Sequence, residues 1–350
     1  MITPSPSSPS SPSCSAEDAD ICLSEPTEAL EAMLKRIPGD FMVLGAGGKM
    51  GLHLCLMLRR ALNATDAKRR VVAVSRFSST DTQDDFKSRG IEITVCDLSD
   101  PQQLEQLEEL PNIIFMAGAK FGTSDQPDVL RRTNIEMPAQ VADKFKNSRI
   151  TGFSTGCVYS FYSTDSSGPD ENGITDPVGE YAQSCLGREK AFLESAALHG
   201  TRVSLIRLNY SVEFRYGLPV DLAGKILREE PISLEMSHAN IIWQRDAIIH
   251  SLLAHEWASS EVFILNVTRP EICRIRDLAL RLGELLGKKP IFEGSEAPTA
   301  WISNPQKAIH MFGESETSVD SILRYVAAWQ LRGLPTLGKP TGFDKRDGNF

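Results

Sequence analysis

The chain has 350 residues, of which 41% are apolar and 24% are charged, and its formal net charge is −9 at pH 7. This composition is typical of a globular protein with one large domain or two smaller ones. A protein that coats nucleic-acid phosphates needs a surface rich in Lys and Arg, so the negative balance argues against nucleic acid as a partner. Small molecules are the expected partners.

The cysteine pattern and the N-terminal sequence bear on the cellular compartment. Seven cysteines are far apart, with no C-x-x-C pair and no histidine at metal-ligand spacing, at positions 14, 22, 55, 96, 157, 185 and 273. The start, MITPSPSSPSSPSCSAEDAD, lacks the basic and apolar regions of a secretory signal. No apolar run approaches the roughly 20 residues that a membrane-spanning helix requires. These features predict a cytoplasmic protein with no metal site and no membrane contact.

Residues 1–24 are Ser/Pro-rich and then acidic, which predicts a disordered tail. Residues 26–36 predict a short amphipathic helix that ends before Pro38 and Gly39. From residue 40 to about residue 210, apolar strand-like runs alternate with helical stretches. Strands that are apolar on both faces and alternate with helices predict an α/β fold. We therefore expect a Rossmann-type doubly wound parallel sheet in a domain of residues 25–210.

Beyond residue 210 the alternation loosens. We expect helices at 221–229, 274–287 and 318–331 and a strand at 263–267. These elements predict a smaller C-terminal substrate-binding lobe over residues 211–335, with some segments returning to the sheet. Residues 336–350 are polar and Gly-rich and predict a C-terminal tail without an assigned function.

The stretch GAGGKMG at 45–51 follows the apolar strand FMVL and opens the helical stretch GLHLCLMLRRAL. In a dinucleotide-binding loop, Gly45 permits the tight turn, Gly48 lets the backbone approach a pyrophosphate, and Gly51 permits close packing of helix on strand. Such a stretch can also be a plain turn, but its place at the first strand-to-helix turn favours the cofactor site. The predicted cofactor contacts of this loop are Gly45, Gly47, Gly48, Lys49, Met50 and Gly51.

The ends of the next strands bear on which cofactor binds. An NAD site places an acid after the second strand to hold the ribose 2′-hydroxyl, whereas this chain has Ser75 and Arg76 there. A hydroxyl and a guanidinium suit a 2′-phosphate, so NADP is favoured over NAD, although Arg76 can also be a surface charge. Asp97 and Leu98 close the third strand; Asp97 either accepts a hydrogen bond from the adenine amino group or caps the following helix.

Three features now stand in order: GAGGKMG, the strand end STGCVY, and Tyr181 on a helix 26 residues after Thr155. Together they resemble the extended branch of the short-chain dehydrogenase/reductase family, which contains nucleotide-sugar epimerases, dehydratases and reductases. The resemblance covers roughly residues 40–330. It implies that Thr155 and Tyr181 flank the substrate carbon that undergoes hydride transfer.

The resemblance has further implications. The segment MAGAKFG places Ala117, Gly118 and Ala119 at the small-residue turn under the cofactor. A sugar or nucleotide sugar is the implied substrate. The implied assembly is a homodimer through the helix of Tyr181, on which Phe192, Leu193, Ala196 and Ala197 form an apolar stripe that core packing also explains.

One position departs from the family, whose helix reads Tyr-x-x-x-Lys where this chain has Cys185. A free tyrosine has a pKa near 10, and the ammonium that lowers this pKa in the family is absent here. Lys190 faces the opposite side of the helix, and Arg188 lies one turn too far unless its side chain folds back. Lys120, which by resemblance borders the same cleft, is the first choice for a substitute cation. Its alternatives are a contact to a substrate anion or a plain surface lysine.

Two hypotheses follow. In the first, the protein is an NADP-linked oxidoreductase or epimerase that acts on a hydroxyl or carbonyl of a sugar or nucleotide sugar, with Tyr181 as general acid/base, Thr155 polarising the reacting oxygen, and Lys120 in support. In the second, it is a non-catalytic NAD(P)-binding sensor or scaffold that kept the glycine loop and lost the reactive pair.

Overall fold

The computed structural model describes residues 15–65, 68–119 and 126–348. Its centre is a seven-stranded sheet in the order β12-β7-β5-β4-β1-β2-β3. Every neighbouring pair in this sheet is parallel. The strands are β1 (Phe41–Leu44), β2 (Val71–Ser75), β3 (Glu92–Val95), β4 (Asn112–Phe115), β5 (Arg149–Thr155), β7 (Arg202–Leu208) and β12 (Phe263–Val267). The predicted Rossmann-type parallel sheet is confirmed.

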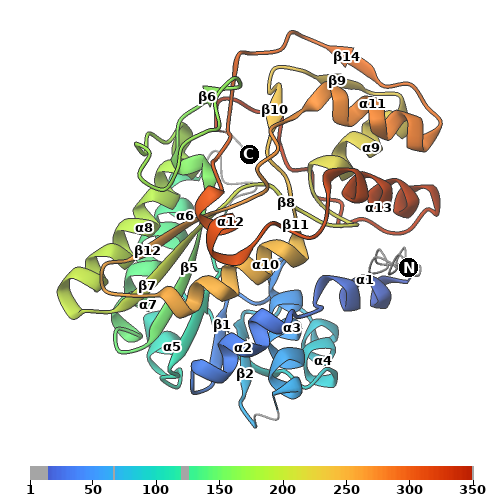
Figure 1. The fold of residues 1–350 in the computed structure, drawn as a ribbon. Helices are drawn as coiled ribbons and strands as arrows, with labels where there is room; N and C mark the ends of the chain where they lie inside the picture. Colours follow the sequence, from blue (N-terminus) through green and yellow to red (C-terminus); the bar gives the residue numbers. More distant parts are fainter. Residues whose placement is uncertain (1–14, 66–67, 120–125, 349–350) are drawn as a thin grey trace, which may run out of the picture.

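Helices cover both faces of the sheet, because alternate side chains of each strand point to opposite sides. Phe41 and Val43 belong to the core on one face, whereas Met42 and Leu44 belong to the core on the other. The first face is covered by α2 (Glu28–Arg36), α3 (Gly51–Ala64) and α10 (Gln244–Leu253), and the second by α5 (Pro101–Glu105), α7 (Met137–Lys144) and α8 (Gly179–His199). Figure 1 shows these two layers on either side of the strands.

The smaller lobe is built on three helices, α9 (Leu218–Arg228), α11 (Ile275–Leu286) and α13 (Val319–Leu331), which share one apolar core. Figure 1 shows this lobe above the carboxyl ends of the sheet strands. Other helices are α4 (Thr80–Ser88), α6 (Pro127–Arg131) and α12 (Gln306–Phe312). Short paired strands complete the fold: β6 (Tyr162–Ser163), β8 (Ser211–Val212), β9 (Pro231–Ser233), β10 (His238–Ala239), β11 (Ile242–Trp243), β13 (Cys273–Arg274), β14 (Ile291–Glu293) and β15 (Thr299–Ala300).

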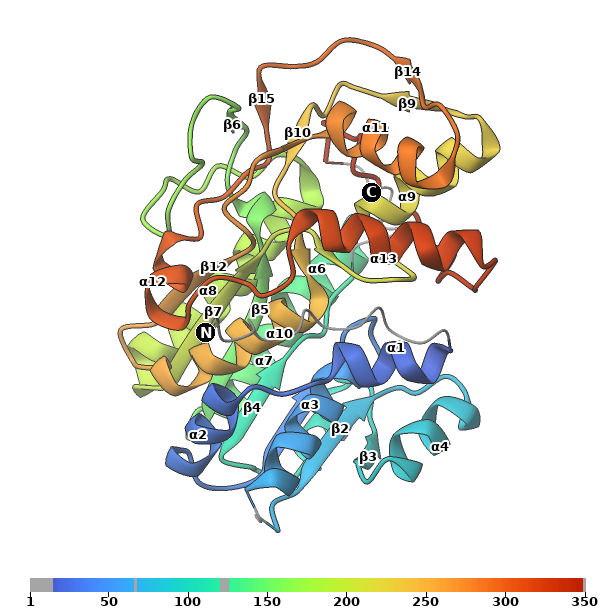
Figure 2. The same cartoon turned by 45° about the vertical axis from the view of Figure 1, so that its right-hand side comes forward.

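The expected disordered tail over residues 1–24 is wrong for its last third, because Ala16–Leu23 form helix α1. Ser15 caps the start of this helix with a capping box. Its side chain accepts a hydrogen bond from the Asp18 backbone N–H, and the Asp18 carboxylate accepts one from the Ser15 backbone N–H. Ala19 and Leu23 are buried in a core shared with the C-terminal lobe. In Figure 2, α1 lies between α13 and the pair α3 and α4. Residues 1–14 lie outside the described residues.

Composition failed to predict α1 because its stability comes from distant partners. Asp20 is buried and forms ion pairs with His53 at 2.9 Å, Arg89 at 3.0 Å and Arg215 at 3.1 Å. Burial alone would raise the pKa of Asp20, but the hydrogen bonds and electrostatic interactions with these three partners outweigh it and lower the pKa to about 2. Helix α1 therefore joins helix α3, which follows the glycine loop, to the lobe.

The order of the strands positions the site. Strand β1 lies between β2 and β4, so the chain reverses its winding direction at the β1/β4 boundary, where open α/β sheets bind ligands at the carboxyl ends of their strands. Two predicted segments, residues 45–51 after β1 and residues 117–119 after β4, meet at this boundary. Among the described residues, no helix is both long and apolar enough to cross a membrane.

Candidate active site

The glycine loop has the geometry that its sequence predicts. Gly45 has a φ of +87°, and a Cβ there would lie 2.6 Å from Ala117 Cα, so both the turn and the contact with the next loop require glycine. A Cβ on Gly51 would lie 2.1 Å from the Ala46 carbonyl oxygen, so the start of α3 packs directly on the loop. At Gly48 the nearest atom to such a Cβ is the Gly45 oxygen at 3.3 Å, which leaves the approach to the loop open.

Helix α3 begins at this loop without a side-chain cap, since the residue before it, Met50, makes no capping hydrogen bond. The first N–H groups of α3 are thus oriented toward the loop and have no side-chain acceptor at the cap position. An anionic pyrophosphate fits such a helix start. The loop and the uncapped helix together suit a dinucleotide.

Among the cavities that adjoin this loop, two contain the predicted site residues and share part of their lining. The adenosine-side cavity, of about 410 Å³, is lined by the predicted residues Ser75, Arg76, Asp97, Leu98, Ala117, Gly118 and Ala119. The tyrosine cavity, of about 440 Å³, is lined by Lys49, Met50, Gly51, Thr155 and Tyr181. Gly45, Gly47, Gly48, Gly118 and Ala119 line both cavities. The structure therefore brings every predicted site residue to one cleft except Lys120, which lies outside the described residues.

At the adenosine side, Asp97 accepts hydrogen bonds from the Ser99 hydroxyl at 2.7 Å and the Ser99 N–H at 3.0 Å. These bonds, with smaller contributions from Arg76 and Arg132, lower the pKa of Asp97. The next helix, α5, is capped by Asp100 and not by Asp97. Arg76 and Arg132 both line the cavity, so two guanidinium groups stand near the predicted position of the adenosine ribose.

Tyr181 and Thr155 line the tyrosine cavity from α8 and from the end of β5. Thr155 also accepts a hydrogen bond from the Cys157 N–H at 3.2 Å, which fixes its rotamer at the strand end. Burial raises the pKa of Tyr181 well above its ordinary value, and the neighbouring Cys185 and Cys157 raise it further, while Arg188 acts in the opposite direction. Tyr181 is therefore a neutral phenol at neutral pH, able to donate a proton.

Arg188 lines the tyrosine cavity and acts electrostatically on Tyr181. The side chain of Arg188 folds back along α8, so that its Nη1 donates to the Phe153 carbonyl oxygen at 3.0 Å and its Nη2 donates to Asn134 Oδ1 at 2.6 Å. Its Nε is buried and has no hydrogen-bond partner among the described residues. A Cβ on Gly118 would lie 2.2 Å from Arg188 Nη2, so the guanidinium packs against the turn after β4.

Asn134 holds this arrangement together from a π-helical turn over Arg132–Glu136. Its Oδ1 also accepts from the Ala119 N–H at 2.9 Å, and its Nδ2 donates to the Ala119 carbonyl oxygen and to Ser184 Oγ, both at 2.9 Å. Turns of this type are frequent at functional sites. Asn134 thus connects the turn after β4 to the helix that carries Tyr181.

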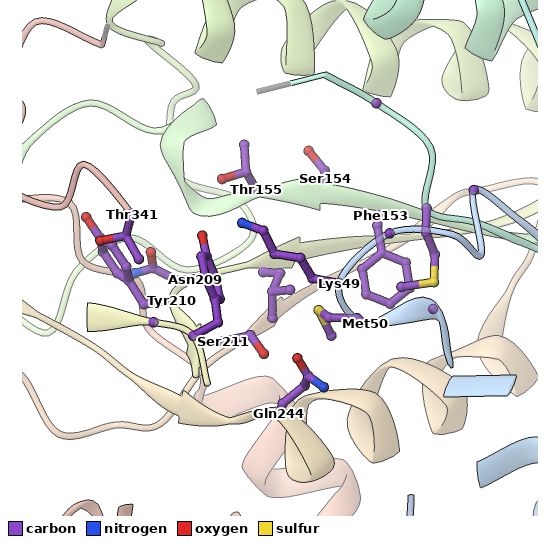
Figure 3. Close-up of a pocket in the computed structure, with 18 of the residues that line it drawn as sticks. Lys49, Met50, Phe153, Ser154, Thr155, Asn209, Tyr210, Ser211, Gln244 and Thr341 are labelled. Atoms are coloured by element: carbon purple, nitrogen blue, oxygen red, sulfur yellow. The ribbon is translucent and has the colours of Figure 1, made fainter. Parts of the chain in front are cut away.

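Sequence reasoning did not predict the role of Asn134, and it ranked Arg188 below Lys120. The usable signal was positional: Arg188 is seven residues after Tyr181 and therefore on the same helix face. Further lining residues of the tyrosine cavity were also missed, and they are shown with Lys49 and Thr155 in Figure 3: Asn209, Tyr210, Ser211, Gln244 and Thr341.

No protein-family model and no curated protein matches this chain in sequence. Solved structures do match it in fold. A UDP-galactose 4-epimerase aligns with a TM-score of 0.66 at 20% identity, over 84% of this chain and 99% of its own. The UDP-glucose 4-epimerase of Thermus thermophilus in complex with NAD aligns with a TM-score of 0.70 at 16% identity, over 84% and 99%. MoeE5 in complex with UDP-glucuronic acid and NAD aligns with a TM-score of 0.68 at 19% identity, over 85% and 100%.

The chain has the fold of the nucleotide-sugar epimerases. This is the architecture of the extended short-chain dehydrogenases/reductases that the motifs resemble, and the predicted fold class is confirmed. At these identities the likeness establishes the epimerase fold alone. The activity of this chain has to be argued from its own residues.

Proposed function

We propose that this protein is an NADP-linked oxidoreductase or epimerase that acts on a hydroxyl or carbonyl group of a sugar or nucleotide sugar. The observation that carries the proposal is the joint position of Thr155, Tyr181 and the glycine loop in one cleft of an epimerase fold. A preference for NADP is supported by Arg76 and Arg132, which line the adenosine-side cavity where an NAD site would present an acid.

The residues of the cleft fit a nicotinamide dinucleotide. The open approach at Gly48 and the uncapped start of α3 suit the pyrophosphate, and Gly118 and Ala119 form the surface between the two cavities. When bound, the nicotinamide supplies hydride transfer to or from the substrate carbon. The chain itself has to bind the substrate, orient it and move the proton.

Tyr181 is the residue that donates and accepts the proton. Its raised pKa keeps the phenol protonated at neutral pH, so it can donate to a substrate oxygen that becomes a hydroxyl. Thr155 is placed to hold that oxygen by a hydrogen bond. Arg188 supplies the positive field that the family obtains from lysine, because it is the cation that lowers the pKa of Tyr181 against the effect of burial.

A second function is favoured by a specific observation. Cys185 is buried beside Tyr181, and burial together with the two cysteines holds the pKa of Tyr181 above its ordinary value. A non-catalytic NAD(P)-binding sensor or scaffold tolerates such a tyrosine, since it needs the dinucleotide cleft and no phenolate.

We also propose a homodimer in a reducing compartment such as the cytoplasm. On α8, Phe192 and Ala196 are buried in the core, whereas Leu193 and Leu198 are exposed on the outer face and offer apolar contact area. None of the six cysteines among the described residues is in a disulfide, which supports the compartment. Sedimentation equilibrium of Leu193→Glu/Leu198→Glu against the parent protein tests the dimer.

Calorimetric titration with NADP⁺ and NAD⁺ tests the proposed function. We expect tighter binding of NADP⁺ and a loss of that preference in Arg76→Ala, because the proposed partner of this guanidinium is the 2′-phosphate, which NAD⁺ lacks. Absence of binding by either cofactor overturns the proposal. A cofactor that binds without any substrate turnover that depends on Tyr181 supports the sensor or scaffold instead.

A further inference from the structure

The tyrosine cavity has an unusual charge for this protein. The chain as a whole carries a net charge of −9, yet the described residues that line this cavity include Lys49, Arg188 and Lys339 and no carboxylate. A cleft lined by one sign of charge concentrates ligands of the opposite sign. Arg188 also donates to Asn134 and to the Phe153 carbonyl oxygen, and Lys49 and Lys339 are the two lysines among the described residues that line the cavity.

Lys49 comes from the glycine loop, but its ammonium points into the tyrosine cavity. Its Nζ lies 3.5 Å from the ring centroid of Tyr216, which lines the same cavity. Figure 3 shows the side chain extending toward the side of the cavity where Thr155 lies. Burial raises the pKa of Tyr216 well above its ordinary value, so Tyr216 is a neutral phenol. Its ring therefore orients the Lys49 ammonium without neutralising the positive charge.

Lys339 belongs to residues 335–348, here named the crossing segment. On the lobe side, Thr341 donates from its N–H to Asp221 Oδ2 at 2.8 Å and from its hydroxyl at 2.5 Å, and Phe343 is buried in the lobe core. Farther on, Arg346 donates to the Thr299 carbonyl oxygen and to Thr299 Oγ1, both at 2.8 Å. The segment that looked like a polar tail is therefore fixed to the lobe.

The crossing segment also reaches the helix of Tyr181. A Cβ on Gly348 would lie 2.8 Å from the Cα of Gly179, the first residue of α8. Lys339 and Thr341, in the first half of the segment, line the tyrosine cavity. The segment thus forms a wall of a cavity of about 440 Å³ that also has to admit the nicotinamide end of the cofactor. Ligand pockets range from about 300 to 1,000 Å³, so the remaining space suits a compound of monosaccharide size.

We propose that the substrate is a small sugar-like compound with an anionic group, a carboxylate or a phosphate, which Lys49 and Lys339 bind together. This inference rests on the proposed function and narrows its substrate class, because the cavity of about 440 Å³ beside the crossing segment has to hold the nicotinamide end of the cofactor as well as the substrate. Lys49 and Lys339 also line a neighbouring cavity, whose lining includes the carboxylates of Asp20, Asp81 and Asp85.

The test is a calorimetric titration of the NADP⁺-loaded protein with four probes: D-glucuronate, glucose 6-phosphate, glucose and UDP-glucuronate. We expect one or both of the small anions to bind more tightly than glucose and UDP-glucuronate. The stronger of the two anions identifies the group as carboxylate or phosphate. Lys339→Ala and Lys49→Met should each weaken that binding by about tenfold to a hundredfold, the range for the loss of one charged hydrogen bond.

Lys345→Ala is the matched control, because Lys345 is an exposed lysine of the same segment that does not line the cavity. Its binding of the anion should equal that of the parent protein. The inference is overturned if neither small anion binds, if glucose or UDP-glucuronate binds as tightly, or if both lysine variants bind like the control. If NADP⁺ itself fails to bind, the proposed function fails, and the same titrations on the cofactor-free protein still test the lysine pair.

Discussion

Tyr181 is held as a neutral phenol by its surroundings, and this determines how activity should vary with pH. Reduction of a carbonyl consumes the phenol proton, whereas oxidation of a hydroxyl requires the phenolate. Because burial raises the pKa of Tyr181 well above its ordinary value, we expect the rate of oxidation to rise with pH throughout the alkaline range and the rate of reduction to be highest near neutrality. Steady-state rates in both directions between pH 6 and about 10 measure this.

Tyr181→Phe is the control for that profile. It should lower kcat by roughly a hundredfold to ten-thousandfold, the usual contribution of a positioned acid or base, and remove the pH dependence of the residual rate. Binding of the cofactor should be unchanged. A flat profile in the parent protein contradicts the assignment of Tyr181 as the proton donor.

Arg188 is a positioning residue whose contribution can be separated from its packing. Arg188→Met keeps most of the side-chain volume but removes the charge next to Asn134 and Tyr181, so kcat of oxidation should fall and its pH profile should shift to higher pH. Arg188→Lys keeps the charge and loses part of the hydrogen bonding, so it should recover part of the rate and of the pH shift. A purely structural arginine would change the thermal midpoint of both variants and leave the pH profile in place.

At the scale of elements, strand β7 and helix α8 are joined by a buried ion pair. Arg207 donates to Glu189 at 2.8 and 3.1 Å, and Ser154 Oγ on β5 donates to the same carboxylate at 2.6 Å. Removing one member of such a pair leaves an uncompensated buried charge. Glu189→Ala should therefore lower the free energy of unfolding by about 3–5 kcal/mol, measured by urea denaturation.

Glu194→Ala is the comparison for Glu189→Ala, since Glu194 is an exposed carboxylate on the same helix. Its effect should stay within about 0.5 kcal/mol. Equal effects of the two substitutions would show that the ion pair adds nothing beyond the helix propensity of the position.

The elements that could be predicted from the sequence are those that are determined by residues close together in the chain. The parallel strands follow from runs of apolar residues, and the glycine loop follows from the steric demands at Gly45 and Gly51. The crossing segment was not predictable, because Thr341 is held by Asp221, 120 positions earlier in the chain. The role of Arg188 depended likewise on a side-chain conformation and on Asn134, 54 positions earlier in the chain, which sequence spacing alone does not fix.

At the scale of the whole molecule, buried histidines make stability depend on pH. His250 on α10 is buried, its Nδ1 has no partner among the described residues, and burial lowers its pKa to about 4. A histidine in the unfolded chain has a pKa near 6.5, so below that pH the unfolded chain binds a proton at His250 that the folded chain does not bind. The neutral His250 therefore does not lower the stability of the folded protein above pH 6.5, and the folded protein loses stability as the pH falls from 6.5 toward 4.

We therefore expect the titration of His250 to lower the free energy of unfolding by about 2 kcal/mol between pH 7 and pH 5. His250→Leu removes this titration, so its stability difference from the parent protein should become more favourable at pH 5 than at pH 7 by about that amount. Urea denaturation midpoints at the two pH values measure it. An unchanged difference at the two pH values would contradict a neutral buried His250.

Strand β12 (Phe263–Val267) pairs with β7, and helix α10 lies against the same sheet, although the residues of the C-terminal lobe come between β7 and both of them. During synthesis, the edge of β7 therefore stays open while the ribosome produces the next fifty or so residues, and the sheet is completed only after part of the lobe has emerged. The central sheet therefore cannot be completed until the first part of the C-terminal lobe, which contains α9, has been synthesised. A nascent chain paused after residue 210 exposes apolar surface and an unpaired strand edge, which makes that interval the point at which chaperones or aggregation would act on this protein.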